Sequence, residues 1–220
     1  LDPAPAVEAL AALAGAGPAL ELAIGTGRVA LPLAERGVQV HGIDVSEAMV
    51  ERLRAKPGGD RIPVTIGDFA DVAVVGRFSL VFVAFNTFFA LASQQDQVRC
   101  FRNVAARLAE GGVFALEGFV PDVARFQRHQ SVSAPRVELD VVMLDVSRHD
   151  PVAQRIDAQH VVINPAGIRL QPVHLRYAWP AELDLMAQLA GMRLRERWGD
   201  WERGPFTADS GRHVSVYELA

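Results

Sequence analysis

The sequence predicts an α/β protein built on a doubly wound, mostly parallel sheet that carries a small antiparallel β insertion. Between Ala19 and Phe119, strand-like and helix-like segments alternate at the spacing of right-handed βαβ units. From Pro121 to Ala178 the pattern changes to longer segments of β-type residues with partial alternation. The chain has 220 residues, of which 50% are hydrophobic, so it can bury one core without disulfides or metals. We therefore expect one domain over 1–220 with an inserted cap over 121–178.

The alternating part consists of a leading helix followed by strands and crossover helices. The predicted strands cover 19–24, 38–43, 62–66, 78–85 and 113–119, and the predicted helices cover 4–14, 28–36, 47–55 and 94–109. The fourth strand is almost uninterrupted in its apolar character, which is typical of a strand covered on both faces. Pro32 lies near the first turn of its helix, where it removes about one hydrogen bond. Gly111-Gly112 is predicted to end the last of these helices.

The insertion is predicted to be an antiparallel meander. Its strands cover 137–146, 155–163 and 169–177, with turn signals at 149–151 and 164–167. A helix over 180–189 and two strands over 192–198 and 212–219 are expected to close the domain. Trp198 and Trp201 border these last strands. We expect them to pack against the sheet edge or to form a subunit contact, in a protein that is a monomer or a homodimer.

The charge balance argues against binding to nucleic acid or to membranes. The chain has 26 acidic and 22 basic residues, a net charge of −4, and no general attraction to phosphate backbones or anionic lipid. The longest apolar run, from Phe78 to Ala92, is interrupted by Asn86 and Thr87 and is too short to span a bilayer. A single cysteine, Cys100, allows no internal disulfide and no multi-cysteine metal site, and we expect it to be a small buried hydrophobe. These features favour a cytoplasmic protein without a bound metal.

A glycine-rich turn, Gly25-Thr26-Gly27, connects the first strand to the first crossover helix. Glycines there allow a tight turn and close approach of a ligand, and the following helix start favours an anionic group. Asp44 ends the second strand, where its carboxylate can accept hydrogen bonds from both hydroxyls of a ribose. With Ala30 in the last place, the turn also satisfies the dinucleotide fingerprint. These residues alone therefore fit a nicotinamide dinucleotide or S-adenosylmethionine.

Two further strand ends carry groups that can contact the same ligand. Gly67-Asp68-Phe69 follows the third strand and supplies a carboxylate for an exocyclic amine and an aromatic face for an adenine. Phe85-Asn86 follows the fourth strand and supplies polar atoms. Because the carboxyl ends of parallel strands meet at one edge of a sheet, we expect these groups to lie beside the glycine turn.

Four segments resemble motifs of the class I S-adenosylmethionine-dependent methyltransferases. They are 21–28 for the first motif, 41–46 with Met49 for the second, 67–69 for the third, and 108–112 for the turn before the fifth strand. The resemblance implies a Rossmann-like, seven-stranded, mostly parallel sheet whose last strand is antiparallel. It implies methyl transfer from S-adenosylmethionine to a small-molecule N or O acceptor. The insertion is similar to the substrate-binding cap of small-molecule enzymes, especially the N,N-dimethyltransferases that act on nucleotide-linked amino sugars.

The same resemblance implies roles for individual residues. Glu21 is implied to hold the methionine amino group, with Gly25 and Gly27 beside the methionine portion. Asp44 is implied to bind the ribose, and Asp68 with Phe69 the adenine. The full cofactor-binding set is Glu21, Gly25, Thr26, Gly27, Asp44, Val45, Met49, Asp68, Phe69, Phe85 and Asn86.

Methyl transfer from a sulfonium needs positioning in a dry pocket and no enzymatic nucleophile. A neutral amine attacks directly, whereas a hydroxyl or ammonium acceptor needs a base such as histidine or a carboxylate. The candidate catalytic residues are Glu117, near the end of the fifth strand, and His174 in the cap; Glu117 could instead pair with an arginine. Arg176, which shares a strand face with His174, and Tyr177 are candidate substrate-binding residues. His160 is a weaker candidate, because strand histidines are more often structural.

Two other functions compete with this interpretation. An NAD(P)-dependent oxidoreductase is supported by the glycine spacing and Asp44, but Asp68-Phe69 and the lack of a second cofactor-binding half weigh against it. A non-catalytic module that keeps the fold would bind S-adenosylmethionine without turnover. RNA and protein acceptors remain open, although the sequence contains no basic stripe in their favour.

Overall fold

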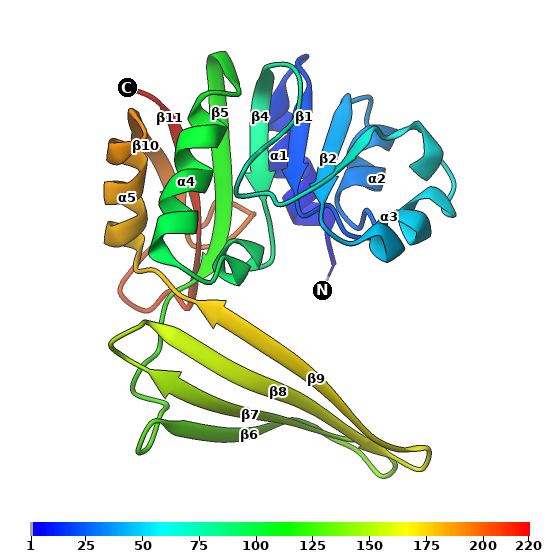
Figure 1. Cartoon of the computed structure of the whole chain (residues 1–220), viewed down its shortest axis with the longest axis vertical. Coiled ribbons are helices and arrows are strands. Elements are labelled where there is room, and N and C mark those ends of the chain that lie inside the picture. Colours follow the sequence, from blue (N-terminus) through cyan, green and yellow to red (C-terminus); the bar gives the residue numbers. More distant parts are fainter. Residues whose placement is uncertain (1) are drawn as a thin grey trace.

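The computed structural model describes residues 2–220 and consists of an α/β core with a separate antiparallel sheet below it (Figure 1). The core sheet has seven strands in the order β10-β11-β5-β4-β1-β2-β3, and the second sheet, called the cap below, has the order β6-β7-β8-β9. In the core sheet β11 is antiparallel to both β10 and β5, and the other neighbours are parallel. The predicted Rossmann-like fold class is confirmed.

The elements have the following bounds. The core strands are β1 (Ala19–Leu22), β2 (Val40–Asp44), β3 (Val64–Ile66), β4 (Phe78–Val83), β5 (Leu108–Phe119), β10 (Met192–Trp198) and β11 (Arg212–Leu219). The cap strands are β6 (Gln130–Val137), β7 (Val142–Asp150), β8 (Arg155–Asn164) and β9 (Gly167–Arg176). The helices are α1 (Ala4–Ala14), α2 (Ala30–Glu35), α3 (Glu47–Arg54), α4 (Gln94–Ala105) and α5 (Pro180–Leu189), with short 3-10 helices η1 (Gly59–Arg61) and η2 (Thr87–Ala90). Among residues 2–220, no helix combines the length and the apolar composition needed to cross a bilayer.

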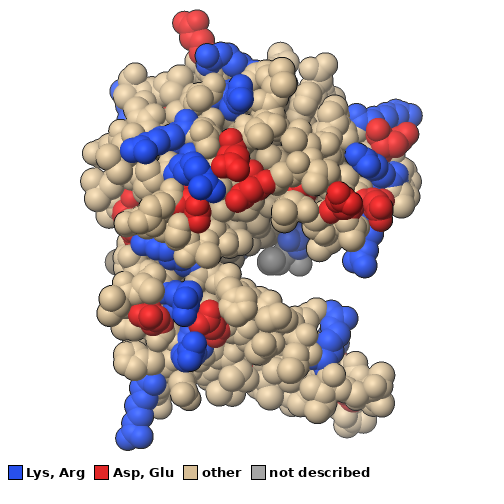
Figure 2. Space-filling model, in the orientation of Figure 1, with Lys and Arg blue, Asp and Glu red and all other residues tan. Residues whose placement is uncertain are grey.

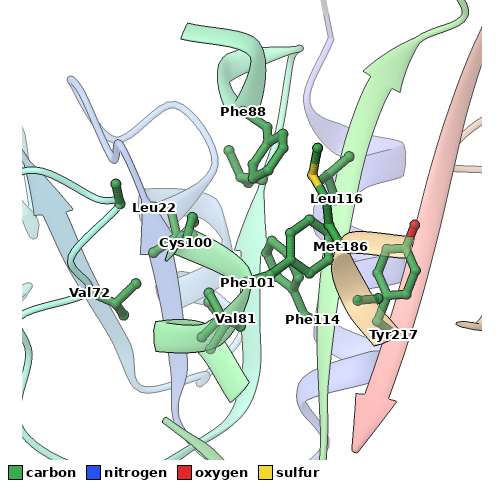
Figure 3. Close-up of a cluster of buried hydrophobic side chains, with 14 of the residues drawn as sticks. Leu22, Val72, Val81, Phe88, Cys100, Phe101, Phe114, Leu116, Met186 and Tyr217 are labelled. Atoms are coloured by element: carbon green, nitrogen blue, oxygen red, sulfur yellow. The ribbon is translucent and has the colours of Figure 1, made fainter. Parts of the chain in front are cut away.

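The core sheet buries both of its faces, as the apolar strands predict. On one face, α4 and α5 pack over an aromatic cluster in which the ring of Phe101 meets Phe114 and Tyr217 edge-on, at 5.3 and 5.4 Å between centroids (Figure 3). Cys100 is fully buried in this cluster, so the expectation of a small buried hydrophobe is confirmed. Burial raises the pKa of the Cys100 thiol.

On the other face, α1, α2 and α3 bury aliphatic side chains together with two tryptophans. Trp198 and Trp201 belong to the same apolar cluster as Val7 and Leu10 of α1. They are 6% and 8% exposed, so they pack inside this layer rather than on its surface. Together the two layers hold the ends of β1, β2, β4 and β5 at one edge of the sheet.

The boundary between α4 and β5 differs from the prediction. The helix ends at Ala105, and Gly111-Gly112 lies inside a strand that begins at Leu108. Gly111 has φ +71°, and a Cβ on Gly112 would lie 2.7 Å from the carbonyl oxygen of Phe78. The two glycines therefore form an irregularity within β5 at the point where its pairing with β4 shifts register.

The cap contains four strands where the sequence predicts three. The unpredicted strand is β6, whose residues are mostly exposed and lack apolar alternation because it lies at the sheet edge. The predicted strand over 137–146 begins too early: the chain turns over 138–141, where the amide of Glu138 donates to the carbonyl of Val141 at 2.8 Å, and β7 starts only at Val142. The strands β8 and β9 and the turn between them are close to their predicted positions.

A buried arginine joins the cap to the core. Arg176, the last residue of β9, donates to the side-chain oxygens of Gln97 on α4 at 2.5 Å and Gln154 at 3.0 Å. It also donates to Glu182 on α5 at 2.7 Å. Burial raises the pKa of Glu182, but hydrogen bonds from Arg176, Gln154 and Gln94 outweigh it and the net pKa is lowered. The cap is thus attached through an ion pair that is largely hidden from water.

Candidate functional site

A cavity of about 430 Å³ lies where β1 and β4 end. Its lining includes Glu21, Gly25, Arg28, Met49 and Phe85. A larger cavity, of about 570 Å³, lies at the opposite end of β2, but it has neither the glycine turn nor a buried carboxylate in its wall. The site is therefore assigned to the smaller cavity, at the edge where parallel sheets bind ligands.

The backbone around this cavity adopts left-handed conformations at several residues. Gly25 has φ +55°, and a Cβ there would meet only the carbonyl oxygen of Ala23, at 4.0 Å, so the turn presents bare backbone to open space. Ala23, Phe85 and Asn86 have φ values of 56°, 56° and 64° without being glycine. Such conformations cost energy and concentrate at functional sites. The strain supports a binding role for both segments.

Asp44 connects the glycine turn to the end of β2. The residue is 7% exposed, and its carboxylate accepts hydrogen bonds from the amide of Gly25 at 2.7 Å and the amide of Ser46 at 2.8 Å. Each carboxylate oxygen keeps a further lone pair for a ligand hydroxyl. Asp44 can therefore shape the turn and bind a ligand at the same time.

Glu21 presents a buried carboxylate to the cavity. It is 6% exposed, and its Oε2 has no hydrogen-bond partner among the described residues. Burial raises the pKa of Glu21 well above its usual value, and a hydrogen bond to the backbone of Ala30 and the charge of Arg28 lower it by less. An unpartnered carboxylate of this kind is a site for a ligand cation.

Arg28 is a cavity residue that the candidate set omits. Its guanidinium carbon lies 3.9 Å from the centroid of the Phe85 ring, so it stacks on a second residue of the cavity wall. In the sequence, Arg28 directly follows Gly27, and this position was the signal that could have placed it at the site. With Glu21 it puts one cationic and one acidic side chain in the wall of the same cavity.

The remaining predicted cofactor residues lie at or beyond the edge of the cavity. Met49 is 41% exposed in the lining, and Val45, which follows Asp44, is 75% exposed. Asp68 is about half exposed and accepts from the amide of Ala70 at 2.8 Å. The amide of the adjacent Gly67 donates to the carbonyl of Asp44 at 2.9 Å, so the third strand end adjoins the second. Thr26 lies in the cavity wall, Phe69 packs on the aromatic cluster, and Gly27 is close to Leu53.

Glu117 lies beneath the turn that follows β4. Its Oε2 accepts a hydrogen bond from the amide of Phe85 at 2.7 Å, and the residue is 6% exposed. This contact holds the left-handed Phe85 in place, and it differs from the arginine salt bridge considered for Glu117. Its catalytic role stays a prediction.

The candidate residues of the cap lie in different surroundings. Tyr177 is 3% exposed and its hydroxyl lies 2.9 Å from Nε2 of His149, beside a second cavity. The side chain of His174 is 69% exposed and bonds to Asp157 at 2.9 Å, while His160 bonds to Asp145. The structure therefore brings Tyr177 to a cavity and leaves the two strand histidines outside both cavities. Their assigned roles stay predictions.

Comparison with known proteins identifies the family. Residues 19–112 match the family model described as a methyltransferase domain. The cypemycin N-terminal methyltransferase of a Streptomyces species is 30% identical over 205 residues, which are 90% of this chain and 82% of that protein. The structure of the CcbJ methyltransferase from Streptomyces caelestis is 45% identical, with a TM-score of 0.94 over 100% of this chain and 90% of that chain.

A more distant structure shows the same fold with the cofactor in place. The amino pentose methyltransferase CalS10 from Micromonospora echinaspora, solved with S-adenosylmethionine bound, is 22% identical with a TM-score of 0.71. The match covers 97% of this chain and 89% of that chain. The motifs, the sheet order and these relatives agree, and the chain belongs to the S-adenosylmethionine-dependent methyltransferases.

Proposed function

We propose that this methyltransferase acts on an amine of a small molecule that binds between the core and the cap. The observation that carries the proposal is the set of hydrogen-bond partners of the carboxylates around the cavity. Glu117 uses its Oε2 to hold the amide of Phe85, and the free oxygen of Glu21 is assigned below to the cofactor. A hydroxyl acceptor would need a base, whereas an uncharged amine attacks with its own lone pair. The name of the 30% identical relative, an N-terminal methyltransferase, supports an amine acceptor.

The residues at the cavity fit S-adenosylmethionine. The unpartnered Oε2 of Glu21 suits the methionine ammonium group, and the guanidinium of Arg28 suits the methionine carboxylate. The open backbone at Gly25 leaves room for the methionine portion, and Asp44 offers lone pairs to the ribose. S-adenosylmethionine supplies an activated methyl group when it is bound.

The remaining work of the chain is to position the acceptor and exclude water. Glu117 acts as a positioning residue in this proposal, because it holds the Phe85 turn that borders the cavity. Tyr177 and the cap close the acceptor side. His174, exposed on the cap, and Arg176, occupied by Glu182, have no direct part in it. Figure 2 shows the hollow between the core and the cap, with acidic and basic side chains interspersed on the face in view.

The acceptor class can be tested by pairing amines with alcohols of the same carbon skeleton. We expect formation of S-adenosylhomocysteine with the amines and none with the alcohols. The acidic limb of the kcat/KM profile should follow the pKa of the amine when a less basic amine is substituted, because only the uncharged amine reacts. Methylation of the alcohols, or an acidic limb that stays at one pH for every amine, would contradict the proposal.

Replacing Glu21 by glutamine should weaken cofactor binding and stabilise the unliganded protein. The loss of a charged partner for the ammonium group should raise the Kd for S-adenosylmethionine about tenfold. Because burial raises the folded-state pKa of Glu21, the wild-type protein loses stability as the pH rises from the ordinary carboxylate range through that raised pKa. Thermal unfolding of both proteins from pH 5 to pH 8 should therefore show a difference that grows with pH.

The matched control is Glu8→Gln, which removes an exposed carboxylate from α1. It should change neither the Kd nor the pH dependence of unfolding. An unchanged Kd in Glu21→Gln would show that Glu21 does not hold the cofactor, even if its effect on stability is as expected.

A further inference from the structure

A second cavity, of about 380 Å³, lies between the end of β5 and the base of the cap. Its walls come from Phe119 and the segment that follows it, from Ile156 of β8, and from Leu175 of β9 with Tyr177. A cavity of this size can bury an organic group of moderate size. Because core and cap both contribute to the wall, a ligand there would bridge the two parts of the molecule.

The walls of this cavity are mainly apolar and aromatic. Phe119 packs edge-on against Phe89, with 4.9 Å between ring centroids, and Phe126 stacks on His149 at 4.6 Å. Ile156 and Leu175 add aliphatic surface from neighbouring cap strands, where they are directly paired. Such rings are held in place by their neighbours, so the cavity can receive an apolar group without rearrangement.

Few charges reach this cavity. Asp122 accepts a hydrogen bond from the amide of Ala124 at 3.1 Å, and the guanidinium of Arg125 lies over the Phe126 ring at 4.7 Å. Tyr177 also lines the cavity, and its hydroxyl is paired with His149. Burial raises the pKa of Tyr177 and lowers that of His149, so the pair is uncharged at neutral pH. One arginine at the rim is a weak match for a diphosphate, which is bound best by several cationic or backbone N–H donors.

The cavity lies close to the cofactor site. Phe119 is two residues beyond Glu117 on β5, which places their backbones about 7 Å apart along the strand. Glu117 in turn holds Phe85 in the wall of the cofactor cavity. A molecule with an amine at one end can therefore reach the cofactor site while its other end occupies the second cavity.

We propose that this second cavity binds the apolar body of the acceptor, so that the substrate is an amine on an uncharged alkyl or aryl group and not a phosphorylated or nucleotide-linked sugar. This inference rests on the proposed function, because it assigns the acceptor side of the same site. The hydroxyl of Tyr177 supplies one hydrogen bond to a neutral polar group of the substrate. The apolar walls supply the affinity.

The test measures binding of straight-chain amines, from butylamine to octylamine, to the complex with S-adenosylhomocysteine. Isothermal titration should show affinity that rises three- to fourfold with each added methylene until the cavity is filled. Leu175→Trp should abolish this dependence by filling the cavity, and Ile156→Phe serves as a second filling variant. Glucosamine 6-phosphate, an amine on a charged sugar, should bind more weakly than hexylamine.

The matched control is Leu170→Trp, on the same strand but on the opposite face, where the side chain is 60% exposed. It should keep the chain-length dependence, and all three variants should bind S-adenosylhomocysteine as the wild type does. Affinity that does not depend on chain length, a dependence that survives in both filling variants, or tighter binding of the sugar phosphate would overturn the inference. Failure of the wild type to methylate any amine would instead refute the proposed function.

Discussion

Asp44→Asn should raise the Kd for S-adenosylmethionine about 100-fold, the largest effect expected at the cofactor site. The carboxylate accepts from the amides of Gly25 and Ser46, and an asparagine amide can accept from only one of them through its single oxygen. One buried amide is then left without an acceptor, and the ribose loses a charged partner. Each such charge-assisted hydrogen bond is worth about 1.5–3 kcal/mol, and about 2.7 kcal/mol corresponds to 100-fold. Isothermal titration with S-adenosylmethionine and S-adenosylhomocysteine measures the change.

The control for this variant is Asp60→Asn, which removes an exposed carboxylate from η1. Its Kd should stay within about twofold of the wild type, as is usual for a surface charge away from the ligand. If Asp44→Asn also binds within a few-fold of the wild type, then Asp44 shapes the turn without contacting the ribose, and the assignment is wrong.

Arg176→Met should reduce the free energy of unfolding by about 3 kcal/mol at pH 7, the largest stability effect expected in the chain. Removing one partner of a buried ion pair leaves the other charge uncompensated, which costs about 3–5 kcal/mol. The side chains of Arg176 and Glu182 are 7% and 17% exposed, so little water can replace the lost contact. Urea unfolding followed by circular dichroism measures the loss, and limited proteolysis should show earlier cleavage in the cap.

The loss of stability in Arg176→Met should depend on pH. The folded-state pKa of Glu182 lies below its ordinary value of 4.5, so its stabilising contribution is present above that value and is lost as the pH falls through the lowered pKa. In Arg176→Met, Glu182 loses its hydrogen bond from Arg176, which lowers its pKa in the wild type, whereas burial still raises that pKa. The deficit should therefore be largest at neutral pH and smaller near pH 4.

Two variants distinguish the effect of breaking the ion pair from the effect of removing any arginine. Arg169→Met removes an exposed arginine from the same strand and should change stability by less than about 0.5 kcal/mol. Arg176→Met combined with Glu182→Leu should recover much of the loss, because no uncompensated charge remains. A double variant that is as unstable as Arg176→Met would contradict a charge-based explanation and point to packing.

Most of the core could be predicted because its signals are local. The apolar runs of β1, β2 and β4 and the serine cap of α3, whose hydroxyl accepts from the amide of Met49 at 3.3 Å, act within a few residues of the chain. The closing strands over 192–198 and 212–219 are at their predicted positions. By contrast, β6 is an edge strand with both faces exposed, so it has no burial pattern to detect.

The candidate site also has one part that the sequence predicts and another that only the structure reveals. Strand ends that follow one another in the sequence lead to Glu21, the glycine turn and Asp44, because parallel strands place their carboxyl ends together. The structure adds Arg28 through its stacking on Phe85, a contact that no spacing rule predicts. It also leaves His174 exposed and bonded to Asp157, because only the packing of the cap on the core decides which face of β9 borders a cavity.

By itself, the sequence determined the fold class, the cofactor family and the acidic residues at the strand ends, since each depends on patterns within one or two elements. The tertiary structure decided which partners the functional side chains contact. Glu117 meets Phe85 across 32 residues and Arg176 meets Gln97 across 79, and such pairings depend on how distant segments pack. The mainly apolar cavity under the cap has the same origin, because its walls include residues of β5, β8 and β9 and exist only once the cap is folded against the core.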